Sequence, residues 1–301
     1  MKPTIIISAC LNNKQVRYNG TNANDEIVNK IKNLFELTDV CPEVSVGLGI
    51  PRKPIRLNKL NNEFKVIQEE TGLDLTEKLK KFSYETVNTY KDKICAAILK
   101  ARSPSCGVGN CKYYINNKIY GKTYGVFARI IKEELPYLPL TDEGRLRNVE
   151  LKWEFLTKTF LLFRFKSLNK DINSFLEFHT KNKYILMGLS QKHLRILGRI
   201  LASYKKISSE EIFRNYEITF KEMLSLNFKR KNLANALIHI FGHISKNLSR
   251  KEKENFLKIV DKYKNNNLDI SVATEMLKIY VLRFNDNYLL MQNFFEPFPE
   301  I

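Results

Sequence analysis

The fold is decided by the stretch Ile94-Cys95-Ala96-Ala97-Ile98-Leu99-Lys100-Ala101, which leads into Ser103-Pro104-Ser105-Cys106-Gly107. Short apolar runs that end at Pro, Gly or Ser are typical of parallel strands buried on both faces. Two earlier runs have the same form: residues 5–9 precede Cys10, and residues 34–40 precede Cys41. The segments between the runs are long and helical enough to be crossovers. The pattern predicts an α/β fold with a Rossmann-like parallel sheet and a cysteine at the end of each of three strands.

These three cysteines are the strongest functional signal in the chain. In an open α/β sheet the crevice lies outside the carboxyl ends of the strands, so Cys10, Cys41 and Cys106 could converge there. Three fixed thiolates with an open fourth position would describe a catalytic metal centre better than a closed structural one. The spacing contains no close Cys-x-x-Cys pair, however, and buried cysteines often act only as small apolar side chains. From spacing alone, both interpretations stay open.

Other candidate residues lie near the same strand ends. Glu43, two residues after the second cysteine, could serve in general acid/base chemistry, or it could be a solvated loop carboxylate. Ser103 could be catalytic or could only cap a turn. Cys111 is a possible but lower-ranked fourth ligand, whereas packing inside its strand explains Cys95.

The length of 301 residues predicts two domains. We expect an α/β domain over residues 1–148 and an all-α domain over residues 149–301. Helices are predicted over 25–35, 74–92 and 126–135, with an edge strand near 138–140. The second half carries apolar periodicity typical of a helical bundle. The predicted helical segments there are 172–204 with a break near Gly188, 212–226, 233–248, 251–263 with a capping box from Ser249 to Glu252, and 271–295.

The formal net charge is +18, with +7 in residues 1–150 and +11 in residues 151–301. This excess favours a polyanionic partner such as nucleic acid, although a lysine-rich composition can also serve solubility alone. Lys192, Arg195 and Arg199, one helical turn apart, could form a phosphate-binding face together with residues 229–231.

We expect a cytoplasmic protein without a membrane partner. No apolar run approaches the 18 residues of a membrane span. The start of the chain enters a strand at once and shows no signal peptide. Five cysteines, an odd number, favour reduced thiols over a disulfide framework.

Several motifs together resemble the thiouracil desulfurase family. They are Ser8-Ala9-Cys10-Leu11, Arg17-Tyr18-Asn19-Gly20, Cys41-Pro42-Glu43, Gly47-Leu48, Pro51-Arg52-Lys53-Pro54 and residues 98–107. The second half resembles the YbgA-like domain. This resemblance rests on residues 179–184, 197–199, Asn235, 239–242 and 292–299. The order of the two domains is similar to that of bacterial tRNA 4-thiouridine desulfidases.

The resemblance implies a cofactor and a reaction. Cys10, Cys41 and Cys106 would hold a 4Fe-4S cluster whose fourth iron lacks a protein ligand and binds the sulfur of a thiolated pyrimidine. Water would add to the ring carbon, Glu43 would activate it or move protons, and Ser103 would assist by hydrogen bonding or proton relay. The expected function is non-redox desulfuration of 4-thiouridine in tRNA to uridine with release of sulfide. The helical half would bind the tRNA, mostly through its phosphates and its shape.

Two competing functions remain open at this point. The same chemistry could act on free thiouracil or thionucleosides. A non-catalytic RNA-binding protein with a structural metal is the alternative from a different class, and it predicts that loss of Glu43 would change nothing.

Overall fold

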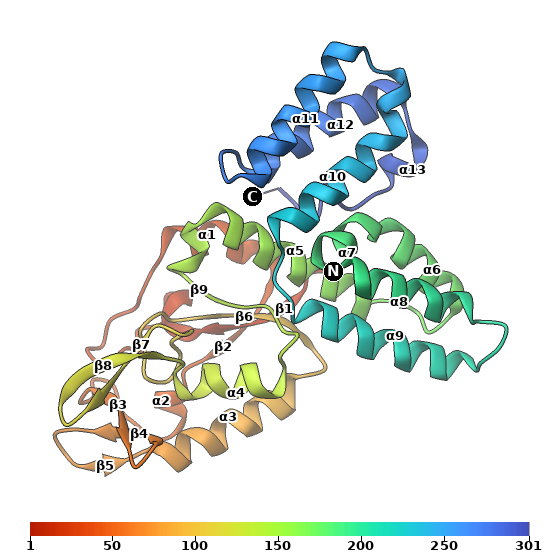
Figure 1. The fold of residues 1–301 in the computed structure, drawn as a ribbon. Coiled ribbons are helices and arrows are strands. Elements are labelled where there is room, and N and C mark those ends of the chain that lie inside the picture. Colours follow the sequence, from red (N-terminus) through yellow and green to blue (C-terminus); the bar gives the residue numbers. More distant parts are fainter. Residues whose placement is uncertain (301) are drawn as a thin grey trace. The chain divides into compact units, whose positions relative to one another are not determined.

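The computed structural model describes residues 1–300, which form two compact units that divide between Phe155 and Leu156. The first unit contains both β-sheets, and the second is helical (Figure 1). The division falls inside helix α5 (Val149–Lys166). An α/β region followed by a helical region is therefore confirmed as the fold class.

The first sheet is a four-stranded parallel sheet with the order β2-β1-β6-β9. Its strands are β1 (Thr4–Ser8), β2 (Glu36–Val40), β6 (Ile94–Leu99) and β9 (Leu140–Asp142). All six residues of β6 are buried, as expected for a central strand covered on both faces. The chain runs from β1 outward to β2 and then crosses back to β6. The three cysteine-bearing strand ends therefore meet around a topological switch point, where α/β proteins bind ligands.

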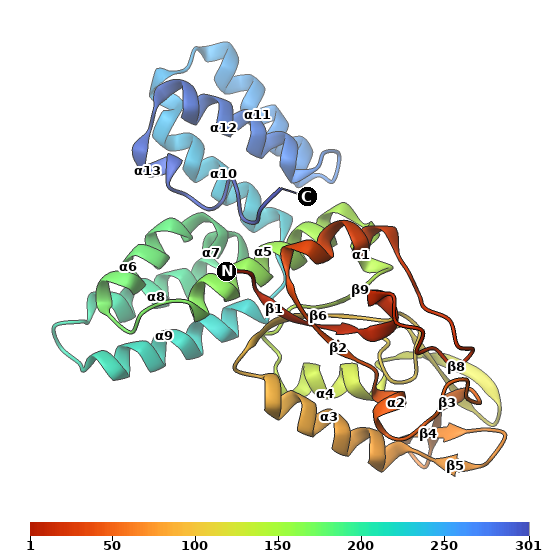
Figure 2. The same cartoon turned by 180° about the vertical axis from the view of Figure 1, so that it is seen from behind.

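Helices cover both sides of this sheet. Helix α1 (Glu26–Ile31) lies on one side, and α3 (Thr76–Tyr90) and α4 (Val126–Glu134) lie together on the other (Figures 1 and 2). Asp25 begins α1 because its carboxylate accepts hydrogen bonds from the backbone N–H groups of residues 27 and 28. The predicted helices and edge strand of this region are confirmed.

A second sheet of five strands, with the order β5-β4-β3-β7-β8, was not predicted from the sequence. Its strands are β3 (Ile55–Leu60), β4 (Glu63–Gln68), β5 (Leu73–Asp74), β7 (Cys111–Ile115) and β8 (Lys118–Thr123). The β3–β4 and β7–β8 hairpins each turn at an Asn-Asn pair, residues 61–62 and 116–117, with positive φ at all four residues. Two positive φ angles in a two-residue turn match the twist of a hairpin, and asparagine tolerates them. These pairs were the signal that could have revealed the sheet.

In the described residues, the helical unit continues from α5 through eight further α-helices. They are α6 (Ile172–Lys181), α7 (Lys183–Leu189), α8 (Gln191–Ala202), α9 (Ser209–Leu224), α10 (Arg230–Ile244), α11 (Arg250–Lys264), α12 (Ile270–Phe284) and α13 (Asn287–Leu290). Part of its core is a cluster of aromatic rings: Phe165, Phe175, Phe178, Tyr216 and Phe220. The predicted capping box of α11 is confirmed, because Ser249 and Glu252 each accept a hydrogen bond from the other's backbone N–H.

The predicted break of segment 172–204 near Gly188 is confirmed, because α7 ends at Leu189 and Ser190 caps α8. A second break, at Asn182, was not predicted. Gly188 lies inside α7, where a Cβ would approach Leu233 Cδ2 to 2.5 Å, so this glycine permits close packing against α10. The predicted helix 271–295 ends at Phe284, because Asn285 adopts a left-handed conformation with φ of 49°.

No helix in the described part of the chain combines the length and the apolar character needed to span a bilayer.

Candidate active site

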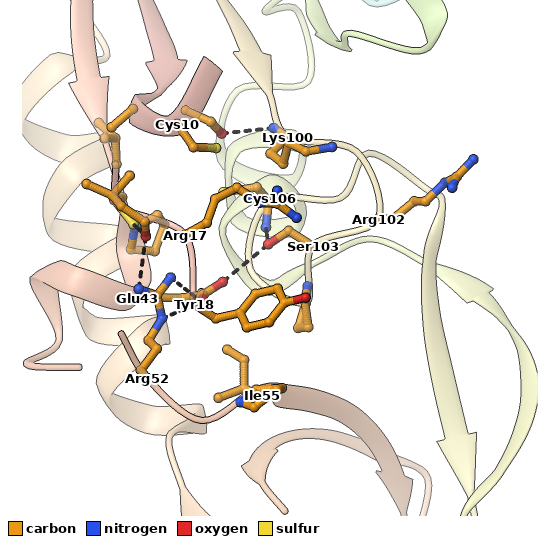
Figure 3. A pocket seen from close by; sticks show the side chains of 18 of the residues that line it. Cys10, Arg17, Tyr18, Glu43, Arg52, Ile55, Lys100, Arg102, Ser103 and Cys106 are labelled. Carbon is orange, nitrogen blue, oxygen red and sulfur yellow. Dashed lines mark hydrogen bonds and ion pairs between the residues drawn. The ribbon is translucent and has the colours of Figure 1, made fainter. Parts of the chain in front are cut away.

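A cavity of about 380 Å³ opens at the carboxyl ends of β1, β2 and β6 (Figure 3). Residues that follow each of the three strands line it, and the loop before β3 closes one side. The lining residues used below are Cys10, Arg17, Tyr18, Cys41, Glu43, Arg52, Lys100, Arg102, Ser103 and Cys106. The volume is near the lower end of the roughly 300–1,000 Å³ typical of small-molecule pockets.

Three thiols face this cavity from three different strand ends. Cys10 lies in a single 3-10 turn (Ala9–Asn12) directly after β1, and Cys41 is the N-cap residue of the short helix α2 (Pro42–Ser45) after β2. Cys106 lies in the loop after β6, and all three cysteines are free. The structure therefore brings together the three cysteines that the sequence singled out.

Burial dominates the acid strength of these thiols. Burial and, as a smaller contribution, the nearby Cys41 together raise the pKa of Cys10 to about 11. Burial also raises the pKa of Cys41. It raises the pKa of Cys106 well above the ordinary value, and the charges of Cys10 and Cys41 raise that pKa as well. Such thiols stay protonated at neutral pH unless a cationic group binds them, because metal ligation requires the thiolate.

The three thiols suit a cluster of several metal atoms that fills the cavity better than they suit a single metal ion. Among the described residues, no set of three or more His, Cys, Asp or Glu side chains is arranged to hold a single metal ion. The three thiols instead surround a shared space, and Cys111 and Cys95 do not line it. Three soft sulfur donors around a cavity suit an iron–sulfur cluster with one iron left without a protein ligand.

Glu43 is held in this cavity by Arg52, which the sequence interpretation did not select as a site residue. The guanidinium donates from Nε (3.0 Å) and Nη2 (2.8 Å) to Oε2 of Glu43, and from Nη1 (2.9 Å) to the carbonyl oxygen of Val16. The side chains of Arg52 and Glu43 are only 6% and 14% exposed. A buried ion pair made by two N–H groups of one guanidinium, which also donates to a backbone carbonyl, fixes the orientation of the carboxylate.

The other carboxylate oxygen faces two hydroxyl groups. Oε1 of Glu43 accepts hydrogen bonds from Ser105 Oγ (3.1 Å) and from Ser103 Oγ (3.4 Å). Ser103 Oγ itself accepts from the backbone N–H groups of Ser105 and Cys106, both at 3.1 Å. Ser103 thus caps the turn that presents Cys106, and its proton is directed at Glu43. The two sequence interpretations of Ser103 are compatible.

The mouth of the cavity carries positive and aromatic side chains. Arg17, Lys100 and Arg102 line it, and the Arg17 guanidinium lies 5.7 Å from the ring centre of Tyr18, which is 44% exposed. Lys100 pairs with Glu143, which also accepts from the backbone N–H of Ala101. These groups suit a polar, planar ligand that carries partial negative charge.

The remaining candidates from the sequence lie elsewhere. Cys111 is buried in β7, where its thiol contacts the carbonyl oxygen of Lys112, and burial raises its pKa to about 12. Cys95 is buried inside β6. Arg230 of the predicted phosphate face donates to the carbonyl oxygens of Tyr263 and Leu268, so it serves the fold.

Fold and site together define an α/β protein with a thiol-lined pocket at the switch point of a parallel sheet. The chain belongs to the 2-thiouracil desulfurase family, which its residues 5–143 match. Residues 183–299 match a second family, described as a protein of unknown function, DUF1722.

Individual proteins resemble one half of the chain each. The uncharacterized protein YbbK of Bacillus subtilis is 32% identical over 139 residues, which cover 43% of this chain and 89% of YbbK. The uncharacterized protein YbgA of Escherichia coli is 21% identical over 141 residues, 46% of this chain and 83% of YbgA. A solved structure titled [4Fe-4S]-dependent thiouracil desulfidase TudS matches 50% of this chain and 98% of its own, with 26% identity and a TM-score of 0.40.

Proposed function

We propose that this protein removes the sulfur of a thiolated pyrimidine by a non-redox exchange with water, with a 4Fe-4S cluster held by Cys10, Cys41 and Cys106. The observation that carries the proposal is the meeting of three thiols and an ion-paired carboxylate in one cavity of a chain from the 2-thiouracil desulfurase family. Five free cysteines and a cluster suit a reducing compartment, so we propose a cytoplasmic location.

The reaction balances without an electron donor. The carbon–sulfur double bond of the base and one water give a carbonyl and hydrogen sulfide, and both water protons leave with the sulfur. When bound, the cluster supplies a soft Lewis acid that polarises the carbon–sulfur bond.

The protein side chains supply the proton chemistry in this proposal. Oε2 of Glu43 is occupied by Arg52, so Oε1 is the oxygen that takes a proton from the attacking water. Ser103, whose hydroxyl lies between Oε1 and the turn bearing Cys106, passes that proton on toward the departing sulfur. Tyr18 and Arg17 hold the ring at the mouth of the cavity.

The test is anaerobic reconstitution with iron and sulfide, followed by incubation with free 2-thiouracil or 4-thiouracil. We expect loss of the thiocarbonyl absorbance and release of one sulfide per base. Glu43→Gln should lose about 10²–10⁴-fold in turnover while retaining its cluster. The matched control is Glu63→Gln, at an exposed position of β4. Wild-type turnover by Glu43→Gln would exclude the proposed role of Glu43. No turnover by a wild-type protein that carries an intact cluster would favour a non-catalytic protein.

A second candidate substrate is 4-thiouridine in tRNA. It is favoured by the net charge of +11 in residues 151–301 and by Lys192, Arg195 and Arg199, which are exposed one turn apart on α8. A strong positive face attracts a phosphate backbone with a marked salt dependence.

The two substrates can be separated in the full-length protein. A triple change of Lys192, Arg195 and Arg199 to Gln should weaken tRNA turnover and reduce the log–log salt slope of tRNA binding by up to about 3, while free-base turnover stays unchanged. Turnover of the free base with no activity on thiolated tRNA would remove the second candidate.

A further inference from the structure

A second cavity, of about 250 Å³, lies wholly within the helical unit. It is bordered by the last turn of α5, by α6 and by Asn293 of the C-terminal segment. The sequence motifs at residues 179–184 and 292–299, which the proposed reaction does not use, meet beside it. Asn293 donates from its backbone to the carbonyl oxygen of Lys181 and from its side chain to Asn182.

Arg164 is the unusual group in this cavity. Its Nη1 is buried without a hydrogen-bond partner, and no ion pair to Arg164 is found in the described part of the chain. Burial lowers the pKa of this guanidinium to about 10, with no carboxylate offsetting the effect. A desolvated cation without a counter-charge is costly, and an orphaned buried donor usually marks a missing partner.

Several other polar groups of the wall already have partners. Glu177 pairs with Lys181, so this carboxylate does not neutralise the guanidinium. Asn182 donates to the carbonyl oxygen of Phe178 and accepts from Asn293, and Ser174 donates to Asp171. The wall thus contains one carboxylate, that of Glu177, and two cations, those of Arg164 and Lys181. It therefore carries a net positive charge.

We propose that this cavity binds an anion, specifically a phosphate group, with Arg164 as its principal ligand and Lys181 as a second positive charge. A planar guanidinium with free donors matches a tetrahedral oxyanion through paired N–H···O bonds. A cavity of this volume takes one phosphate group and leaves no room for a packed nucleic-acid helix. The phosphate can be free in solution or part of an RNA backbone, and the site does not depend on the proposed desulfuration.

The first experiment is thermal unfolding of the full-length protein in sodium phosphate and in sodium chloride of equal ionic strength. Phosphate also stabilises proteins generally by exclusion from their surface, so the informative quantity is the difference between variants. We expect phosphate to raise the wild-type Tm by at least about 2 °C more than it raises that of Arg164→Gln. Arg214→Gln, which removes an equal charge from an exposed position of α9, should behave as wild type.

The variant Arg164→Met gives a sharper signature. Removing an unpaired buried charge is often stabilising, so this variant should have a Tm equal to or above wild type in chloride and below it in saturating phosphate. If changes at Arg164 prevent folding, Lys181→Gln tests the same site, because this lysine side chain is 41% exposed and its replacement should leave the fold intact.

Isothermal titration distinguishes the source of the phosphate. With inorganic phosphate, the wild type should bind one more equivalent per chain than Arg164→Gln. With a short single-stranded RNA, tighter binding that also depends on Arg164 would identify a backbone phosphate, and binding of inorganic phosphate alone would identify a free anion. Equal phosphate response and equal stoichiometry in wild type and Arg164→Gln would overturn the proposal.

Discussion

Arg52 and Glu43 form a buried ion pair in which one arginine occupies a single oxygen of the carboxylate through two hydrogen bonds, at 2.8 and 3.0 Å. The other oxygen is left for Ser103 and Ser105. The two oxygens of the carboxylate therefore differ: Oε2 is held by Arg52, and Oε1 is available to the serine hydroxyl groups. This division is what makes Glu43 suitable as a base in the proposed reaction.

Replacing Arg52 should impair turnover without touching the thiols. In Arg52→Gln the carboxylate loses its two-point anchor, so we expect turnover to fall at least tenfold, with cluster content unchanged in the visible spectrum. Arg52→Lys keeps the charge but not the fork, and should recover only part of the rate. Full activity of Arg52→Gln would show that the orientation of Glu43 does not matter.

The two serines that face Glu43 should differ in effect. Ser103→Ala removes the hydroxyl that donates to Glu43 and also caps two backbone N–H groups, so it should lower turnover and cost about 0.5–2 kcal/mol of stability. Ser105→Ala removes only one donor to the same oxygen, and should affect turnover less. Kinetics and thermal unfolding of both variants check this order, and a larger loss of turnover in Ser105→Ala would assign the relay to Ser105.

Thiol reactivity before cluster assembly should follow the raised pKa values. Because the pKa of Cys10 rises from 9.0 to about 11, its thiolate fraction at pH 8 is about 100-fold lower than for an ordinary thiol. Alkylation of the apoprotein at Cys10, followed by peptide mass spectrometry, should therefore be slow at pH 8 and accelerate with pH up to about 11. Fast alkylation at neutral pH would contradict the buried setting of this thiol.

Cluster formation should depend on only three of the five cysteines. Changing Cys10, Cys41 or Cys106 to Ser should abolish or strongly reduce the visible absorption after reconstitution, because each supplies one wall of the cavity. Cys111→Ser serves as the matched control, since Cys111 lies in β7 and does not line the cavity. An intact cluster in any of the three cavity variants would require a different ligand set.

Two glycines of the helical unit provide a stability test of the packing. Gly188→Ala places a methyl group 2.5 Å from Leu233 Cδ2, so it should destabilise the protein by about 1–3 kcal/mol. Gly242→Ala, at an exposed position of α10 with nothing within 4 Å of its Cβ, should be neutral or stabilising by up to about 1 kcal/mol. Chemical denaturation of both variants measures the difference, and equal stabilities would contradict the close contact of α7 with α10.

Local patterns in the sequence were enough for the parallel sheet and for most of the helices. The fully apolar run 94–99 predicts a strand covered on both faces, and the structure has one there. The capping box of Ser249 and Glu252 marks the start of α11. The second sheet escaped prediction because its strands are partly exposed and lack a continuous apolar run. In addition, the pairing of β3 with β7 joins residues far apart in the chain. Only the Asn-Asn turns marked it locally.

The sequence by itself determined that a cysteine follows each of three strands, since strand ends are a matter of local apolar pattern. Only the tertiary structure decided that Arg52 anchors Glu43 and that Ser105 shares its free oxygen, because these contacts come from loops whose paths depend on long-range packing. The same holds for Arg164, which in the sequence is one arginine among many. Its burial beside Asn293 requires the C-terminal segment to fold back onto α6, and no local pattern specifies that closure.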